Sequence, residues 1–266
     1  MQIVVIGAGN LATSLVPAFA RCGHQITQVV SRTLPSAEQL ALFVSQNYSQ
    51  RVEALANIAK VTADADLYVL AVVDDVIPLV AAELVKVIGS GKHIVCHTSG
   101  SVPLGTLLAY FEHSAVFYPF QTFKKTEPLL FDDIPLFVEA TDDTTRTTML
   151  ALARQLSDEV YVSTSEQLKR LHIAGVFANN FTNCMYAIAR EQLDRAGLPF
   201  SVLLPLIGKT ATKVKTINPR DAQTGPASRG DTQTINQHLR LLGENERQIY
   251  EAVTQNIIKH TSSDEI

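Results

Sequence analysis

Residues 1–15 have the sequence MQIVVIGAGNLATSL, and this stretch decides the fold of the N-terminal half. Residues 3–6 form an unbroken apolar run, which is typical of a parallel strand buried on both faces. Gly7, Gly9 and Ala12 follow at the G-x-G-x-x-G/A spacing, and a helical pattern continues through Phe19. The stretch therefore predicts a strand, a tight turn and a helix at the start of an α/β domain.

Each small residue of this turn has a physical role. Gly7 allows the tight turn, Gly9 lets the backbone approach a pyrophosphate, and Ala12 lets the helix pack closely on the strand. The free N–H groups and positive dipole end of the helix attract a diphosphate. We therefore expect a Rossmann dinucleotide-binding domain with an open, mostly parallel sheet. A glycine turn without a ligand is the alternative.

The composition excludes several classes of protein. Of the 266 residues, 46% are hydrophobic and 18% charged, the net charge is −4 and no long basic run occurs, so we expect neither nucleic acid nor an anionic membrane surface as partner. The most apolar long stretch contains a histidine and three asparagines, which argues against a membrane span. Three cysteines without metal-ligand spacing predict no metal site and indicate a reducing cytoplasm.

The tip of the second predicted strand indicates which dinucleotide binds. The strand over residues 26–30 ends at Ser31-Arg32-Thr33, about twenty residues beyond the glycines, where NAD enzymes carry an acid for the ribose hydroxyls. A cation and two hydroxyls stand here instead. Arginine presents a fork of donors to phosphate oxygens, so Ser31 and Arg32 favour the 2′-phosphate of NADP over NAD. An ordinary exposed loop arginine is the alternative.

Further strands are expected at residues 67–72, 93–97, 115–118, 136–139 and 160–162, with helices between them. Ligands bind at the carboxyl ends of parallel strands in open α/β sheets. Val72 ends the first of these strands, and Ser99 and Gly100 follow the second, so we expect these three residues beside the cofactor. For Ser99 and Gly100 the alternative is a hydroxyl-rich turn that caps the next helix.

The second half lacks strand patterns, so we expect a Rossmann domain over residues 1–163 and an all-helical domain over 164–266. One long helix is predicted at residues 165–196. It is apolar on most sides, which indicates burial in a core or between subunits. At about 100° per residue, His172, Asn179 and Asn183 share one face, with Asn180 on an adjoining one. They form either a polar wall facing the cofactor or a set of helix–helix hydrogen bonds.

Two residues of this half have candidate chemical roles. His172 is a candidate proton donor, since the ordinary pKa of histidine, roughly 6.5, suits acid–base work near neutral pH. Arg229, in a loop rich in Gly and Pro, is a candidate clamp for a substrate carboxylate. The alternatives for this loop are a local pair of Arg229 with Asp231, or Asp231 as the cap of the next helix.

Several motifs resemble a bacterial family with a Rossmann-like domain followed by a DUF2520 domain. They are GAGNLA at 7–12, Ser31-Arg32, HTSGS at 97–101, YPFQTF at 118–123, the segment 172–183, and GPASRGD at 225–231. The family is similar to pyrroline-5-carboxylate reductase, ketopantoate reductase and 6-phosphogluconate dehydrogenase-like enzymes. One departure concerns Tyr118, because the family often has histidine there, so a catalytic role for this position is doubtful.

The resemblance implies an NADP-binding Rossmann domain, a helical domain like the C-terminal domain of 6-phosphogluconate dehydrogenase, and a homodimer formed through it. It carries site roles to Gly7, Gly9, Asn10, Leu11, Ser31, Arg32, Ser99, His172, Asn180, Arg229 and Asp231, and it favours Asn180 over Asn179. The expected function is NADP-dependent reduction of a small carbonyl or imine that carries a carboxylate, with Asn180 and Asn183 orienting it. Ketopantoate reductase and an inactive NADP-binding sensor are the alternatives.

Overall fold

The structure is a computed structural model that describes residues 1–261. Its contacts divide the chain into two compact units, one from Met1 to Ala178 and one beginning at Asn179. The last strand ends at Val162, so strands are confined to the first unit, as expected. The first unit continues past the predicted boundary at residue 163, because the helix over Ser165–Gly175 packs against it.

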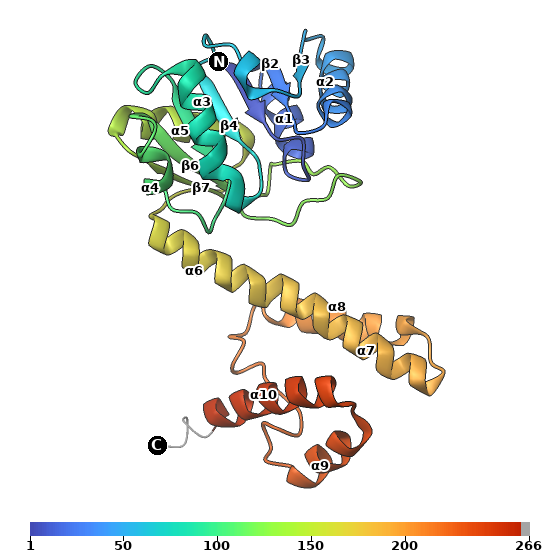
Figure 1. The fold of residues 1–266 in the computed structure, drawn as a ribbon. Coiled ribbons are helices and arrows are strands. Elements are labelled where there is room, and N and C mark those ends of the chain that lie inside the picture. Colours follow the sequence, from blue (N-terminus) through green and yellow to red (C-terminus); the bar gives the residue numbers. More distant parts are fainter. Residues whose placement is uncertain (262–266) are drawn as a thin grey trace. The chain divides into compact units, whose positions relative to one another are not determined.

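The first unit is built on an eight-stranded sheet with the order β3-β2-β1-β4-β5-β6-β7-β8 (Figure 1). All neighbouring pairs are parallel except β6 and β7, which confirms the predicted, mostly parallel α/β fold. No strand pattern in the sequence predicts β3, which is only three residues long. The strands are β1 (Gln2–Ile6), β2 (Gln25–Val30), β3 (Glu53–Leu55), β4 (Leu67–Leu70), β5 (Ile94–His97), β6 (Ser114–Pro119), β7 (Leu136–Ala140) and β8 (Val160–Val162).

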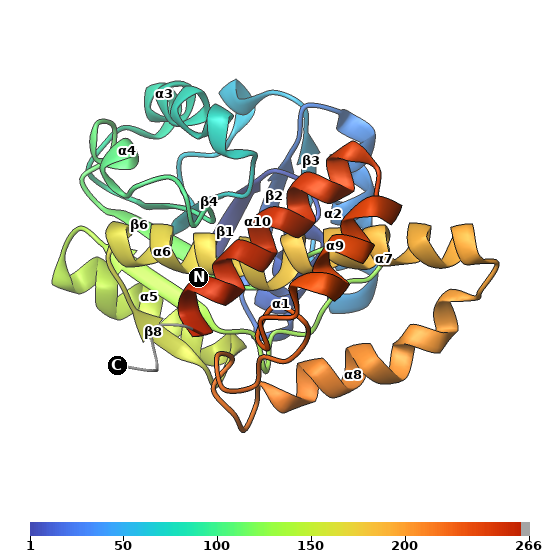
Figure 2. The same ribbon diagram turned by 90° about the horizontal axis from the view of Figure 1, so that it is seen from below.

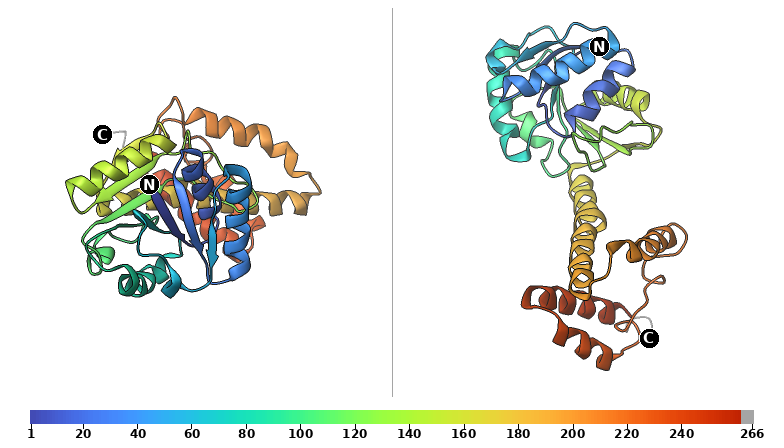
Figure 3. Two further views of the ribbon diagram at one scale, coloured as in Figure 1. Left: turned by 90° about the horizontal axis from the view of Figure 1, so that it is seen from above. Right: turned by 90° about the vertical axis from the view of Figure 1, so that its right-hand side faces the viewer.

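Helices cover both faces of this sheet (Figures 2 and 3). Helices α1 (Ala12–Arg21), α2 (Leu34–Tyr48) and α5 (Asp143–Leu156) contribute to the apolar core on one face. Helices α3 (Ile77–Ile88) and α4 (Gly105–Leu108) contribute to the core on the other. Two 3₁₀ turns, η1 (Ile58–Lys60) and η2 (Asp74–Val76), complete the connections. The sheet is thus buried on both sides, as its continuous apolar strands predict.

The strand register brings the ends of five strands to one edge of the sheet. Ile6, the last residue of β1, pairs with Val30 of β2 and with Leu70 of β4. Leu70 pairs in turn with His97 of β5, and His97 with Val116 of β6. Because these pairs are parallel, the loops that follow β1, β2, β4, β5 and β6 all leave from this edge. We call it the carboxyl edge.

Helix α6 (Ser165–Gly175) belongs to the first unit because its N-terminus is anchored there. Thr164 and Gln167 form a capping box at its start. The Ser165 hydroxyl donates a hydrogen bond to Glu139 at 2.5 Å and accepts one from the Leu104 amide at 3.0 Å. Leu168 is buried in a small apolar cluster with residues that precede α4 and lie in β6. These contacts explain why the unit extends beyond residue 163.

The second unit is helical, as predicted. A π-helical segment, η3 (Val176–Phe181), leads into α7 (Thr182–Ala196). The 3₁₀ turn η4 (Phe200–Leu203), α8 (Leu204–Lys213), α9 (Thr232–Leu241) and α10 (Glu244–Thr261) follow. Helices α9 and α10 lie side by side (Figure 1), joined by a hydrogen bond of 2.9 Å between His238 and Tyr250. None of the helices within residues 1–261 is long and apolar enough to cross a membrane.

The second unit buries very little of its apolar surface. Within residues 179–260, Ala227 is the only buried residue. Burial of α7 in a core is therefore not formed within this chain, and burial between subunits stays a prediction. The exposed large apolar side chains of this unit are Phe181, Met185, Leu198, Val202, Leu204, Leu206, Val214, Ile217, Leu241, Val253 and Ile258.

Candidate functional site

The glycine turn after β1 has the geometry that its sequence predicts. Gly7 has a φ of +124°, and a Cβ there would lie 2.0 Å from the carbonyl oxygen of Ala71. Any side chain at Gly7 would therefore collide with the backbone after β4. At Gly9, by contrast, a Cβ would meet no atom within 4 Å. Gly7 is required by close packing, whereas Gly9 leaves open space beside the start of α1.

This open space at Gly9 is where the sequence predicts that the diphosphate of a dinucleotide binds. The amides of Thr13 and Ser14 donate to the carbonyls of Gly9 and Leu11. Helix α1 has no acidic residue in its first turn that would oppose an anion at its positive dipole end. Asn10 is exposed and Leu11 half-buried at this turn. The Asn10 side chain accepts a hydrogen bond of 3.3 Å from the Lys125 amide, so the segment after β6 passes beside the turn.

The end of β2 places the residues predicted to select NADP at the carboxyl edge. The Ser31 amide donates to the Leu55 carbonyl at 2.9 Å, which fixes the backbone just before Arg32. Arg32 itself is exposed, and none of the ion pairs formed within residues 1–261 involves it. Its role in binding the 2′-phosphate stays a prediction.

Val72, Ser99 and Gly100 follow β4 and β5 at the same edge. Val72 is half-buried against the core on the α3 face. The Ser99 hydroxyl accepts hydrogen bonds from the amides of Ser101, at 3.0 Å, and Val102, at 3.1 Å. The alternative interpretation of Ser99, a hydroxyl-rich turn, is therefore formed here. Contact of Val72, Ser99 and Gly100 with a cofactor stays a prediction.

Tyr118, for which the sequence predicts no catalytic role, lies at this edge and contacts His172, the predicted proton donor. The phenolic oxygen of Tyr118, at the end of β6, lies 3.2 Å from Nδ1 of His172 in α6. Both side chains are half-buried. The sequence shows a residue at a strand end and a histidine in a later helix, but it holds no signal that pairs them. The pair adds Tyr118 to the candidate site.

His97, the last residue of β5, is a second imidazole near this edge, and it is fully buried. Its Nδ1 accepts a hydrogen bond of 3.2 Å from the Ser99 amide, which places the proton on Nε2. Nε2 is buried and has no hydrogen bond of normal geometry within the described residues. Burial lowers the pKa of His97 to about 4, against smaller opposing effects of the Pro103 carbonyl and the Asp74 carboxylate. The imidazole is therefore neutral at physiological pH.

This buried neutral histidine predicts a loss of stability in acid. The pKa of His97 is lower in the folded chain, about 4, than its ordinary value of 6.5, so the unfolded chain binds the extra proton first. The free energy of unfolding should fall by about 3 kcal/mol as the pH drops from about 6.5 to about 4. Urea unfolding of the wild type and of His97→Asn at several pH values in this range measures the free energy of unfolding. If this free energy falls equally steeply with pH in both proteins, the prediction is refuted.

The remaining predicted site residues lie outside the unit that contains His172. Asn180, Asn183 and Arg229 belong to the second unit, and all three are exposed. The shared face predicted for His172, Asn179 and Asn183 assumed an unbroken α-helix. The π-helical segment η3 lies between His172 and Asn183 and contains Asn179. It has more residues per turn than an α-helix, so that alignment no longer follows. Roles for Asn180, Asn183 and Arg229 stay proposals.

The loop before α9 shows which of the two roles suggested for Asp231, ion pair with Arg229 or helix cap, is formed. The Asp231 carboxylate accepts hydrogen bonds from the Thr234 amide, at 3.0 Å, and from its hydroxyl, at 2.7 Å. These bonds, more than the charge of Arg229, lower the pKa of Asp231. Asp231 is thus the N-cap of α9, and the Arg229 guanidinium forms none of the ion pairs within residues 1–261.

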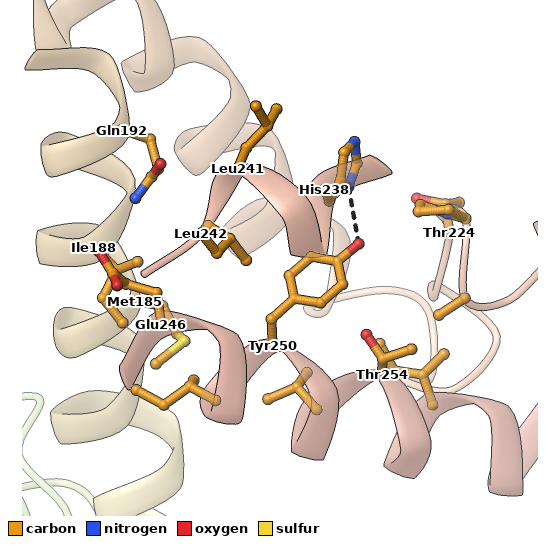
Figure 4. Close-up of a pocket in the computed structure, with 15 residues that line it drawn as sticks. Met185, Ile188, Gln192, Thr224, His238, Leu241, Leu242, Glu246, Tyr250 and Thr254 are labelled. Atoms are coloured by element: carbon orange, nitrogen blue, oxygen red, sulfur yellow. Dashed lines mark hydrogen bonds between the residues drawn. The ribbon is translucent and has the colours of Figure 1, made fainter. Parts of the chain in front are cut away.

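The second unit contains a cavity of about 480 Å³ between α7, the loop before α9, and α9 and α10 (Figure 4). Its lining is mostly apolar, with the hydrogen-bonded pair His238 and Tyr250 at one side. The labelled apolar side chains in Figure 4 are Met185, Ile188, Leu241 and Leu242. The polar side chains of the lining are Gln192, Thr224, His238, Glu246, Tyr250 and Thr254.

The sheet and its glycine turn define a Rossmann dinucleotide-binding protein. Residues 2–100 match the family model described as NADP oxidoreductase coenzyme F420-dependent, and residues 134–257 match the domain of unknown function DUF2520. A solved structure described as a candidate NADP oxidoreductase from Bacteroides fragilis is 41% identical to the chain. It covers 97% of this chain and 98% of its own length, with a TM-score of 0.87.

The chain therefore belongs to the family of NADP oxidoreductases that join these two domains. The predicted family and its cofactor, NADP, are confirmed. No curated protein matches the chain.

More distant structures share the fold alone. Protein TM1727 from Thermotoga maritima is 22% identical, covers 99% of this chain and 100% of its own, and has a TM-score of 0.71. A pyrroline-5-carboxylate reductase from Coxiella burnetii is 15% identical, covers 98% and 97%, and has a TM-score of 0.58. The two-part plan of the chain thus recurs across a wide range of sequences.

Proposed function

We propose that this chain reduces a small carbonyl or imine compound that carries a carboxylate, with NADPH as the reductant. The observation that carries the proposal is the carboxyl edge itself. The glycine turn after Gly7 and the hydrogen-bonded pair of Tyr118 and His172 both lie at this edge, within one compact unit. A phosphate-binding turn and an acid–base group at one sheet edge are the two parts that such a reduction requires.

Different residues at the carboxyl edge would bind different parts of the cofactor. NADPH supplies the hydride when it is bound. The open backbone at Gly9 and the start of α1, with Asn10 and Leu11, would hold the diphosphate. Ser31 and Arg32 would hold the 2′-phosphate. Val72, Ser99 and Gly100 would line the edge further along the sheet.

The protein's own part in the chemistry is to orient the substrate and to supply one proton. We assign the proton to His172, since the imidazole is half-exposed and so reachable from solvent and from a ligand. Asn180 and Asn183 would orient the carbonyl or imine, and both amides are exposed. Arg229 would hold the carboxylate, because its guanidinium forms no ion pair within residues 1–261.

The test is a titration of the purified protein with NADPH and NADH, followed by oxidation of NADPH with a panel of 2-oxo acids and cyclic imines. Tighter binding of NADPH with turnover of a panel member is the expected result. Ketopantoate as the best substrate would identify the chain as a ketopantoate reductase. Binding of NADPH without turnover of any carbonyl or imine would refute the reduction and leave a nucleotide sensor.

We also propose that the second unit forms a homodimer with a second copy of itself. A stable helical unit needs a buried core, and residues 179–260 bury only Ala227 within the chain. Large apolar patches exposed on a soluble protein mark interaction surfaces, and symmetric dimers are the commonest oligomers. The apolar cavity of Figure 4 would receive helices of the other copy.

This proposal predicts the mass of the protein in solution. Light scattering should give twice the chain mass of 29.0 kDa. Leu241, 77% exposed and part of the cavity lining, is a sensitive position, so Leu241→Glu should shift the mass toward that of one chain. The control is Leu42→Glu, the same substitution at an exposed leucine on α2 of the first unit. A monomeric wild-type protein would contradict the dimer.

A further inference from the structure

The Tyr118 ring is fixed in place by its neighbours. A Cβ at Gly100 would lie 2.5 Å from Cζ of the ring, so the backbone after β5 lies directly against it. The ring of Phe120 meets it edge-on, with 6.0 Å between the ring centroids. The phenol therefore has little freedom to turn away, and the absence of a side chain at Gly100 is what admits it.

His172 is held with similar firmness. Leu168, one turn earlier in α6, is buried, and the helix start is fixed by its capping box. At the other end of α6, Gly175 lies against Phe120, where a Cβ would come within 2.8 Å of the ring. Phe120 thus contacts both Tyr118 and the helix that carries His172. The same ring therefore holds both residues of the hydrogen-bonded pair in position.

We propose that Tyr118 is a positioning residue for His172: its phenolic oxygen accepts a hydrogen bond from Nδ1–H of the imidazole, which leaves Nε2 as the nitrogen that exchanges the proton with substrate. This inference rests on the proposed function. It extends the candidate site to a residue that the sequence had set aside.

The proton inventory is consistent with this assignment. The imidazolium of His172 gives its Nε2 proton to the substrate oxygen or nitrogen as the adjoining carbon accepts the hydride, so the substrate gains two electrons and NADPH becomes NADP⁺. His172 is then neutral, and Nδ1–H still donates to Tyr118. Water restores the proton to Nε2. Tyr118 itself keeps its proton throughout, because burial and then the Asp74 carboxylate raise the pKa of its phenol.

The deciding measurement is the tautomer of His172, read by NMR on protein with ¹⁵N-labelled histidine. We expect the neutral imidazole of the wild type to carry its proton on Nδ1. Tyr118→Phe keeps the ring against Gly100 and removes only the oxygen, so the tautomer should no longer be fixed. The kcat of the variant should fall about 10-fold, while the Kd for NADPH stays within about twofold.

Tyr161→Phe is the matched control, because Tyr161 is exposed on β8 and its hydroxyl contacts Glu159. It should change neither the tautomer nor kcat. A wild-type proton on Nε2, or an unchanged kcat in Tyr118→Phe, would overturn the proposal. If the substrate panel shows no turnover, the proposed function fails by that assay, whereas the tautomer of the wild type and of Tyr118→Phe still decides whether Tyr118 fixes His172.

Discussion

Replacing His172 with alanine should lower kcat by about 100-fold or more and leave the Kd for NADPH within about twofold. General acid catalysis by a positioned side chain contributes roughly 10²–10⁴-fold, and His172 is the half-exposed imidazole at the carboxyl edge. Alanine is the best helix former, so α6 should persist. Steady-state turnover of the best panel substrate, with fluorescence titration of NADPH, measures both quantities.

His113→Ala is the appropriate control for this experiment. His113 is also half-exposed and also hydrogen-bonded, through Nδ1 to Asp142 at 3.0 Å, but it precedes β6 and lies at the opposite edge of the sheet. Its loss should leave kcat within about twofold, after correction for the folded fraction. Unchanged turnover in His172→Ala would remove His172 from the mechanism, and the role of Tyr118 with it.

The parts of the fold that depend on local sequence were predictable. Residues 3–6 are apolar without a break, and the steric demand at Gly7 follows directly from the tight turn that the spacing implies. Because parallel strands end at one edge, the placement of Arg32, Val72 and Ser99 along that edge also follows from the order of strands. Helix capping by Asp231 was one of the interpretations that the sequence offered, and it is the one formed.

The parts that depend on long-range packing were not predictable. Strand β3 is three residues long and exists only by pairing with β2. The π-helical segment has no distinctive composition, yet it alters the angular relation between His172 and Asn183 that a regular helix would give. The hydrogen bond between Tyr118 and His172 joins residues 54 apart in sequence. Composition and spacing carry no information about such a contact.

The second unit shows a different limit of sequence analysis. An apolar pattern predicts that a helix is buried, but it does not say whether the covering surface belongs to the same chain. In α7 the apolar side chain of Met185 is exposed within the chain, as is Leu206 in α8. The pattern therefore predicts a burial that this chain alone does not provide, and it does not name the surface that would provide it. The mass of the protein in solution supplies what the pattern lacks.

Replacing Arg32 with alanine should raise the Kd for NADPH about 10- to 100-fold and change the Kd for NADH by less than about threefold. The guanidinium is exposed at the end of β2 and can donate to the 2′-phosphate, which NADH lacks. A hydrogen bond to a charged group contributes roughly 1.5–3 kcal/mol, which corresponds to this range. Fluorescence titrations of both nucleotides at one ionic strength measure the ratio.

Arg51→Ala is the matched control, because Arg51 is also exposed but precedes β3, at the opposite edge of the sheet. Its loss removes the same charge and should leave the ratio of the two Kd values unchanged. Arg32→Asp tests the same site by reversing its charge. A carboxylate there repels the 2′-phosphate and accepts hydrogen bonds from the ribose hydroxyls. This variant should bind NADH more tightly than NADPH. An equal weakening of both nucleotides in Arg32→Ala would show that Arg32 contacts a part that they share.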